Sequence, residues 1–391
     1  MKLKYIFVMS CVSLSIGMQA QTVDEVLSQI ERNNKELQAQ EQTIRASKLE
    51  VQAENNLEDP SVEYSPFYTR GISGMSSSEL VVTQGFDFPT LYAARRQSGK
   101  WKQEVLDRQL RIFRRDILLN AKNLCLDLIL YNQKQTLLVQ RKKNADELLV
   151  LFEKRLKEGD VGVLDVNKIK MELMNVQTEV VQNEAAHRSA LQQLLAMNGN
   201  LPLEFTENTY PSLPELDSYN ELYDEIMSTD ATLLVADANV RAAEKELKVN
   251  RQSWLPKFEV GYRRNTSLDE KSNGFLVGGS LPLFSNRKKG KIIQAQVTSA
   301  KLQVENARLQ AEAQVQSRYN EICKLREAMQ AYDVGLMYKT LDLLNEAVKA
   351  GQLSIIEFYT EADNVYQNLQ AYMELENQYQ KLMADIYKNR L

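Results

Sequence analysis

Two short segments of the chain pair a glycine with a carboxylate. Gly159 lies six residues before Asp165 in RLKEGDVGVLDVNK, and Gly351 lies six residues before Glu357 in AVKAGQLSIIEFYTEA. Each segment joins two helical patterns, so each glycine stands where a helix must end and the chain reverse, a place where a left-handed backbone costs glycine little. Carboxylates at such a reversal could attract cations or hold a closed state through hydrogen bonds. Alternatively, each acid only stabilises the start of its helix through the helix dipole.

Side chains suited to catalysis are few. His187 is the one histidine in 391 residues, and no Cys or acidic residues accompany it at metal-ligand spacing. No nucleophile–base pairing and no phosphate-binding loop is visible, and a single histidine leaves little acid–base chemistry near neutral pH. We therefore predict that the protein is not an enzyme, that it has no cofactor and no metal site, and that His187 is a surface residue.

Composition narrows the class of protein further. The 391 residues include only 15 Gly and 8 Pro, too few for the turns of two or three ordinary domains, which indicates long helices. The formal net charge of −4 and the sequence pI near 5.5 argue against a nucleic-acid partner, which needs a positive surface. Cys125 and Cys323 lie at positions that do not correspond in the two halves of the chain, and we expect two buried free thiols.

The first twenty residues have the layout of a cleavable secretory signal peptide. Lys2 and Lys4 precede an apolar stretch over about 5–17, and small or polar residues then lead to Ala20. The alternative is a lipoprotein cleavage box ending at Cys11, which would leave only about half of a normal apolar core. The sequence therefore predicts export from the cytoplasm, with residues 1–20 removed.

Most of the mature chain is an internal duplication. Pro60 and Pro256 are 196 residues apart, Pro89 and Pro282 are 193 apart, and Gly159 and Gly351 are 192 apart. Such constant offsets indicate two copies of one helix, strand, strand, helix, helix unit. We predict a first repeat over 21–199, a connector with three prolines over 200–217, and a second repeat over 218–391.

The predicted helices share a length rule. In each repeat one long helix faces two shorter helices whose summed length matches it: 92–158 against 22–57 and 163–197, and 287–350 against 219–254 and 354–388. At about 1.5 Å per residue a helix of this length measures about 100 Å. Polar residues all along these helices suit a surface that is wet on two sides, as in a hollow tube.

Each repeat also contains a predicted β-hairpin, over 61–88 and over 257–284. The strands 61–70, 79–88, 257–266 and 274–284 are about ten residues long and alternate apolar with polar positions, as transmembrane β-strands do. The alternative is a pair of half-buried hairpins that cap a helical domain. Four strands cannot close a barrel, so a membrane-spanning role requires oligomeric closure, with eight strands from two copies or twelve from three.

The two helix reversals carry a resemblance to a known family. They resemble the periplasmic tips of the TolC-type outer-membrane efflux proteins, also called outer membrane factors. The resembling residues are Arg155, Gly159, Val161, Asp165 and Val166 in the first tip, and Gly351, Ser354, Ile355, Ile356 and Glu357 in the second. The resemblance implies a mainly α fold with a small β part. In it a homotrimer forms a twelve-stranded β-barrel in outer-membrane lipid and an α-helical barrel that extends into the periplasm.

The resemblance also implies partners and site residues. The open end of the helical tunnel would dock a periplasmic adaptor (membrane fusion) protein that is attached to an inner-membrane pump. The docking residues would be Arg155, Gly159, Val161, Gly351 and Ser354, and the entrance or gate would be lined by Asp165, Glu357 and Glu361.

The sequence departs from the family pattern near the second tip. Val348 and Leu353 occupy the positions where well-studied members carry a Tyr and an Arg that help to latch the entrance. Glu361 lies one residue beyond Thr360, where a second family acid would fall. The same latch is therefore not expected here.

A different class of protein also fits part of the pattern. A periplasmic adaptor or coiled-coil structural protein would share helical hairpins and a signal peptide, although it would show one central hairpin flanked by Gly-rich β-domains. The sequence leaves open whether the passenger is a drug, a metal ion, a peptide or a metabolite, and which adaptor and pump are used.

Overall fold

The computed structural model describes residues 21–284 and 286–391, so the predicted signal peptide lies outside the described residues. The chain divides into two compact units, each assembled from segments that are far apart in sequence. Unit 1 contains the chain up to Asn34 together with Asn120–Leu213 and Leu325–Lys381, and unit 2 contains Lys35–Leu119, Pro214–Lys324 and Leu382–Leu391. Each unit therefore draws on both predicted repeats.

Unit 1 is helical. Its elements are α1 (Val23–Asn33), the C-terminal part of α3 (Pro89–Glu158), α4 (Val163–Met197), α8 (Val334–Lys349) and most of α9 (Ile355–Ile386). In α4 the buried positions recur every three or four residues, so that one stripe of the helix faces the core. The core joins α3, α4, α8 and α9 through buried apolar side chains that include Leu148, Phe152, Ile169, Leu341, Phe358 and Leu369.

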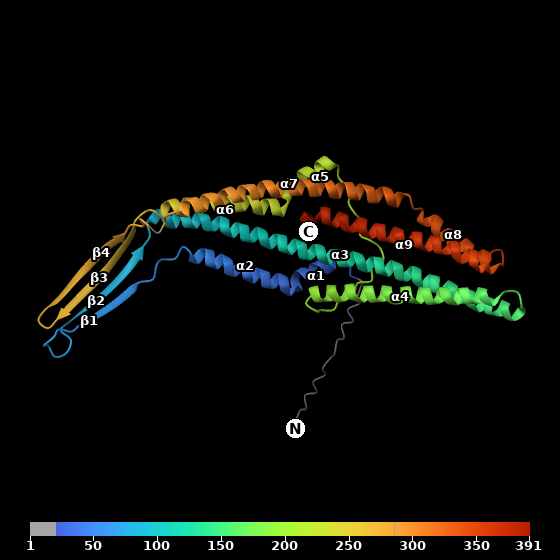
Figure 1. The fold of residues 1–391 in the computed structure, drawn as a ribbon, viewed down its shortest axis with the longest axis horizontal. Helices are drawn as coiled ribbons and strands as arrows, with labels where there is room; N and C mark the ends of the chain where they lie inside the picture. Colours follow the sequence, from blue (N-terminus) through green and yellow to red (C-terminus); the bar gives the residue numbers. More distant parts are fainter. Residues whose placement is uncertain (1–20, 285) are drawn as a thin grey trace, which may run out of the picture. The chain divides into compact units, whose positions relative to one another are not determined.

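Unit 2 combines helices with the single sheet of the described residues. Its helices are α2 (Lys35–Ala53), the N-terminal part of α3, α5 (Tyr219–Thr229), α6 (Ala231–Gln252), α7 (Lys289–Gln330) and the short η1 (Lys388–Arg390). Its strands are β1 (Ser61–Phe67), β2 (Ser77–Phe86), β3 (Lys257–Ser267) and β4 (Lys271–Ser280). All neighbouring strands are antiparallel, in the order β1-β2-β3-β4 (Figure 1).

The register of the sheet puts apolar side chains on one face. Val82 of β2 pairs with Val62 of β1 and with Tyr262 of β3, and Tyr262 pairs in turn with Phe275 of β4. On the opposite face Arg263 forms an ion pair with Glu79 at 3.0 Å. The pairing of β2 with β3 joins the two predicted hairpins into one continuous sheet.

Two of the predicted helices are each broken by one residue. The helix predicted over 22–57 is interrupted at Asn34, and the helix predicted over 219–254 is interrupted at Asp230, where the backbone has φ −63°, ψ 118° and φ −59°, ψ 120° respectively. The Asp230 carboxylate accepts hydrogen bonds from the backbone N–H groups of Thr232 and Leu233, so it starts a new helix in the way typical of an N-cap. The two breaks are 196 residues apart, the same offset as between Pro60 and Pro256.

The long helices of the two repeats differ. The first, α3, runs unbroken and begins at Pro89, which suits the first position of a helix because its missing N–H needs no partner there. The prediction of a single helix over 287–350 is wrong, because residues 331–333 separate α7 from α8. Asp333 accepts a hydrogen bond from the Leu336 N–H at 2.9 Å and so caps the start of α8.

The predicted strands also needed correction at their ends. β1 has seven residues rather than ten, since the chain turns away after Phe67, whose carbonyl accepts from the Ser76 N–H at 2.9 Å. β4 covers 271–280 rather than 274–284, and it ends just before Pro282, which cannot donate to a ladder. Cys125 and Cys323 are both free, but only Cys125 is buried and Cys323 is partly exposed.

No helix in the ranges 21–284 and 286–391 is both long enough and apolar enough to cross a membrane.

Candidate functional site

The first candidate site is the reversal between α3 and α4, which we call tip 1 and define as residues 155–165. Gly159 has a left-handed backbone with φ +82°. Its N–H donates to the Leu156 carbonyl at 3.2 Å, and the next N–H, of Asp160, donates to the Arg155 carbonyl at 2.9 Å. These two bonds form the Schellman motif, which satisfies carbonyls that the end of a helix leaves free.

The reversal between α8 and α9, which we call tip 2 and define as residues 347–357, repeats this geometry. Gly351 has φ +73°, its N–H donates to the Val348 carbonyl at 3.2 Å, and the Gln352 N–H donates to the Ala347 carbonyl at 2.9 Å. Every residue in this pattern lies 192 positions after its counterpart in tip 1. The two reversals are therefore one backbone motif used twice.

The predicted gate acids lie in the first turn of the helices that follow the glycines. The Asp165 carboxylate accepts from the Gly162 N–H at 2.9 Å. The Glu357 carboxylate accepts from the Ser354 N–H at 3.0 Å and from the Ser354 hydroxyl at 2.8 Å, and the hydroxyl accepts from the Glu357 N–H at 3.2 Å. The hydrogen bonds from Ser354, its backbone N–H first, lower the pKa of Glu357. Both acids thus have a structural role within the chain.

Tip 1 and tip 2 are joined by Arg155. Its guanidinium donates to the Lys349 carbonyl at 2.7 Å, near the C-terminal end of α8, and lies 5.4 Å from the centre of the Phe152 ring. Lys349 also forms an ion pair with Glu147 of α3 at 2.7 Å. Val161, another residue of tip 1, packs against the hydrophobic core of unit 1. Two of the predicted docking residues therefore hold the tips together.

The remaining predicted positions fall into two groups. Val348 is fully buried in the core and Leu353 is partly buried, so neither is placed as a surface latch. Glu361 is exposed one turn beyond Glu357 on α9.

Exposed apolar side chains beside the turns were missed by the sequence analysis. Leu164 of tip 1 and Ile356 of tip 2 are equivalent residues, and both are exposed. Val163 is also exposed, whereas its counterpart Ile355 is buried. In the sequence, each of these apolar residues lies in the first helical turn beside a gate acid. A large apolar residue at such a position is not needed for the core, and this could have indicated that it is exposed.

The sheet offers a second candidate site. Its apolar face is bare: Phe275 and Val277 of β4 are 93% and 83% exposed, and Val62 and Tyr64 of β1 are exposed as well. In the described chain the outer edges of β1 and β4 have no strand beside them. Gly261 lies close to β2, because a Cβ there would meet the Val82 carbonyl oxygen at 2.6 Å. An exposed apolar face with open edges is unusual for a protein in water.

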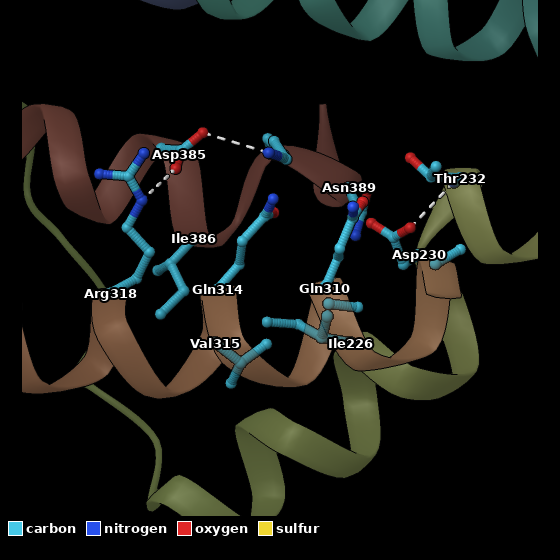
Figure 2. Close-up of a pocket in the computed structure, with 13 residues that line it drawn as sticks. Ile226, Asp230, Thr232, Gln310, Gln314, Val315, Arg318, Asp385, Ile386 and Asn389 are labelled. Atoms are coloured by element: carbon cyan, nitrogen blue, oxygen red, sulfur yellow. Dashed lines mark hydrogen bonds and ion pairs between the residues drawn. The ribbon is translucent and has the colours of Figure 1, made fainter. Parts of the chain in front are cut away.

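A cavity of about 130 Å³ in unit 2 is a weaker candidate (Figure 2). Its charged lining groups already have partners: Arg318 pairs with Asp385 at 3.0 Å, Lys388 pairs with the same carboxylate at 3.2 Å, and Asp230 caps α6. Figure 2 shows Arg318 rising from α7 towards Asp385 at the end of α9. This arrangement fastens α9 to α7 and leaves little free polarity for a ligand. Within the described residues there is also no group of three or more metal-ligating side chains.

Comparisons with known proteins agree with this geometry. Residues 222–388 match the family model described as outer membrane efflux protein. No curated protein matches the sequence. The fold is similar to that of a membrane protein from Pseudomonas aeruginosa, with a TM-score of 0.76 and 15% identity over 95% of this chain and 90% of that chain.

Two further solved structures are outer-membrane proteins. The Campylobacter jejuni CmeC outer membrane channel has a TM-score of 0.71 and 15% identity, over 94% of this chain and 85% of that chain. The outer membrane protein VceC from Vibrio cholerae has a TM-score of 0.66 and 16% identity, over 94% of this chain and 95% of that chain. The mainly helical fold with a small antiparallel sheet is therefore similar to that of solved outer-membrane channels. The resemblance indicated by the two tips is confirmed.

Proposed function

We propose that this chain is one subunit of an outer-membrane exit channel, in agreement with the match of residues 222–388 to the family model described as outer membrane efflux protein. The observation that carries the proposal is the four-stranded sheet of unit 2, whose apolar face is exposed and whose two edges are open. In lipid the apolar face is favourable, but each unpaired backbone group at an open edge costs several kcal/mol. The sheet can therefore cross a membrane only when further strands pair with both edges.

A homotrimer satisfies this requirement. In a cyclic assembly β4 of one copy pairs with β1 of the next, and three copies give twelve strands around a lumen wide enough for water. Two copies would give eight strands, whose interior fills with side chains. The face that carries Glu79 and Arg263 would then line the lumen, and the face that carries Phe275 and Val277 would contact lipid.

The helices of unit 1 support the same type of assembly. On α4 the exposed apolar residues Met171, Met174 and Val181 are spaced by three and seven residues. That spacing is typical of a helix that packs along a neighbouring helix. On α8 Leu336 and Leu343 are exposed and seven residues apart. Packing these α4 residues of one copy on α8 of the next would close a ring of helices in the periplasm.

The two tips would form the periplasmic end of this channel. We expect Leu164 and Ile356, which are exposed there, to dock a periplasmic adaptor protein attached to an inner-membrane pump. Asp165, Glu357 and Glu361 would place carboxylates around the entrance, three of each in a trimer, and such rings favour cations. The capping bonds of Asp165 and Glu357 are compatible with this role, because a carboxylate has more acceptor sites than those bonds use.

The first test is the molar mass of the detergent-extracted protein after the outer and inner membranes have been separated, with bound detergent subtracted. A trimer in the outer membrane that conducts ions in a planar lipid bilayer is the expected result. A monomer in the soluble periplasm would overturn the proposal and favour a periplasmic adaptor or coiled-coil structural protein.

The entrance is tested with the double variant Asp165→Ala, Glu357→Ala. We expect it to assemble as a trimer with a changed conductance or a weaker preference for cations. Unchanged currents would mean that both carboxylates serve only as helix caps.

A further inference from the structure

A buried arginine in unit 1 contacts three carboxylates on two other helices. The Arg141 side chain, on α3, is only 10% exposed. Its Nε lies 2.7 Å from Glu172, and its two terminal nitrogens lie 3.2 Å from Glu179 and 3.0 Å from Asp363. Glu172 and Glu179 belong to α4 and Asp363 belongs to α9, so a single guanidinium joins three helices.

The charges in this cluster do not balance. One positive charge faces three carboxylates, and in the described chain no second cation forms an ion pair with any of them. The other charged or titratable groups that face the cluster are Lys168 of α4, whose ammonium lies 5.9 Å from the centre of the Tyr359 ring, and two tyrosines of α9, Tyr359 and Tyr366. The Tyr366 ring centre is 4.7 Å from the guanidinium carbon, and Gln370 donates to Glu179 at 3.1 Å.

Glu172 is the carboxylate with the least access to water. Its side chain is 4% exposed, against 35% for Glu179 and 36% for Asp363. Burial raises the pKa of Glu172; Arg141 opposes this shift, while the negative charges of Asp363 and Glu179 add to it. A buried charge that lacks full compensation is removed most easily by taking up a proton.

We propose that Arg141 and the three carboxylates form a proton-dependent clasp, which fastens α9 to α3 and α4 more tightly as the medium becomes more acidic, with Glu172 as the group that takes up the proton. A proton from water neutralises the Glu172 carboxylate. Its carbonyl oxygen can still accept from Arg141, and the positive charge is then shared by Glu179 and Asp363 alone. The clasp lies within one chain, so it does not depend on the channel function proposed above.

The location of the clasp gives it a conformational role. α4 begins at tip 1 and α9 begins at tip 2, and both tips belong to unit 1. The clasp is two to four turns from the start of α4 and about two turns from the start of α9. A change in its strength therefore changes how firmly the two helices that lead away from the tips are held to α3.

The first test compares the full-length wild-type protein with the Glu172→Gln variant, which imitates the protonated side chain. A group whose folded pKa is raised contributes stability that is present at low pH and lost as the pH rises through the folded value. The melting temperature of the wild type minus that of the variant should therefore fall, by about 2–4 °C, between about pH 4.5 and about pH 8.5. A difference that stays constant or increases with pH would overturn the proposal.

The matched control is Glu225→Gln in unit 2. The hydrogen bond from Arg390 lowers the pKa of Glu225, so its contribution is present at high pH and lost on acidification. Above about pH 4.5 the difference between the wild type and this variant should stay constant, and below that pH it should decrease, so that its slope is opposite in sign to that for Glu172→Gln. Because both variants replace Glu by Gln, the opposite slopes separate the clasp from any general effect of the substitution.

A second readout follows α9 itself. A spin label can be attached to α9 through a Gln367→Cys substitution, because position 367 is exposed. Cys323 is partly exposed and is therefore replaced by serine in this protein. Cys125 can stay, because burial raises the pKa of its thiol to about 12 and keeps it unreactive. In otherwise wild-type protein we expect the label to become more mobile as the pH rises, and in Glu172→Gln we expect low mobility throughout. Equal pH profiles in the two proteins would contradict the clasp. If the labelled protein shows the expected profile without forming a channel, only the proposed channel function fails.

Discussion

Tip 1 and tip 2 reverse the chain with the same backbone motif but are held in different ways. Both place a left-handed glycine at the turn, and both place an acid at the third position of the next helix. At tip 2 Ser354 completes the capping box with Glu357, whereas at tip 1 the corresponding residue is Gly162, which has no hydroxyl. Ile355 is buried at tip 2, while Val163 is exposed at tip 1.

The helices that lead into the two tips also differ, but here the weaker element is the one at tip 2. α3 reaches tip 1 without a break over 70 residues, while α8, which reaches tip 2, has only 16 residues and is separated from α7 by 331–333. A short helix gains less from its own cooperativity and depends more on its caps and on packing. We infer that the stronger start of α9 offsets the weaker approach through α8, so the two tips have the same backbone geometry but different anchoring.

The largest effect is expected when the shared turn itself is broken. Gly159→Val or Gly351→Val puts a β-branched residue at φ +82° or +73°, which costs about 1–2 kcal/mol or more. Apart from the adjacent residues, no atom of the described part of the chain lies within 4 Å of a Cβ built at either glycine, so the cost is one of backbone strain and not of collision. Thermal unfolding of the protein measures this cost, and under the proposed channel function we also expect loss of export in cells.

Gly162→Ala is the matched control for these variants. Gly162 has φ −87°, and a Cβ there would meet Asp165 at an ordinary distance of 3.5 Å. This variant should lose less stability than the valine variants, because alanine is a poorer N-cap than glycine but does not have to adopt a left-handed backbone at this position. If Gly351→Val lost no more stability than this control, the left-handed turn would not be required at tip 2.

A smaller effect is expected from Ser354→Ala. The change removes the hydroxyl that caps α9 and typically costs about 1 kcal/mol. Because tip 1 already lacks such a hydroxyl, the variant makes the cap of tip 2 resemble that of tip 1. Tip 2 still differs in that the helix leading into it, α8, is separated from α7. Hydrogen exchange of the amides in the first turn of α9 should become faster, while that in the first turn of α4 should not change. Equal acceleration at both tips would mean that the two reversals are not anchored independently.

Glu357→Gln should change how tip 2 responds to pH. The pKa of Glu357 is lowered by the Ser354 hydrogen bonds, so its contribution to stability is present above the unfolded value of about 4.3 and is lost as the pH falls through the folded value. The melting temperature of the wild type should exceed that of the variant at neutral pH, and the difference should disappear in strong acid. A difference that persists below about pH 3 would show that the Gln side chain disturbs packing instead.

The tips also show what the sequence could and could not predict. The glycines and acids were found because a helix reversal restricts both backbone conformation and hydrogen bonding, and those restrictions select residue types. The break at 331–333 was missed because AYD carries neither Gly nor Pro, and a cap made by Asp333 is visible only once the Leu336 N–H is placed. Arg155 was expected to face a partner, but its bond to the Lys349 carbonyl joins residues 194 positions apart, which no local pattern reveals.

The smallest expected effect gives the most direct test of why the two helix starts differ. Gly162→Ser gives tip 1 the hydroxyl that Ser354 provides at tip 2, and the backbone at φ −87° accepts a serine without strain. At the N-cap, serine stabilises a helix by about a few tenths of a kcal/mol more than glycine does. Exchange of the first-turn amides of α4 should slow slightly, with a control of Gly162→Ala that lacks the hydroxyl. If the serine variant then matches tip 2 in protection, the cap accounts for the difference between the two helix starts. If tip 2 remains better protected, the rest of the difference lies in the buried Ile355 or in the longer side chain of Glu357, which occupies the position of Asp165.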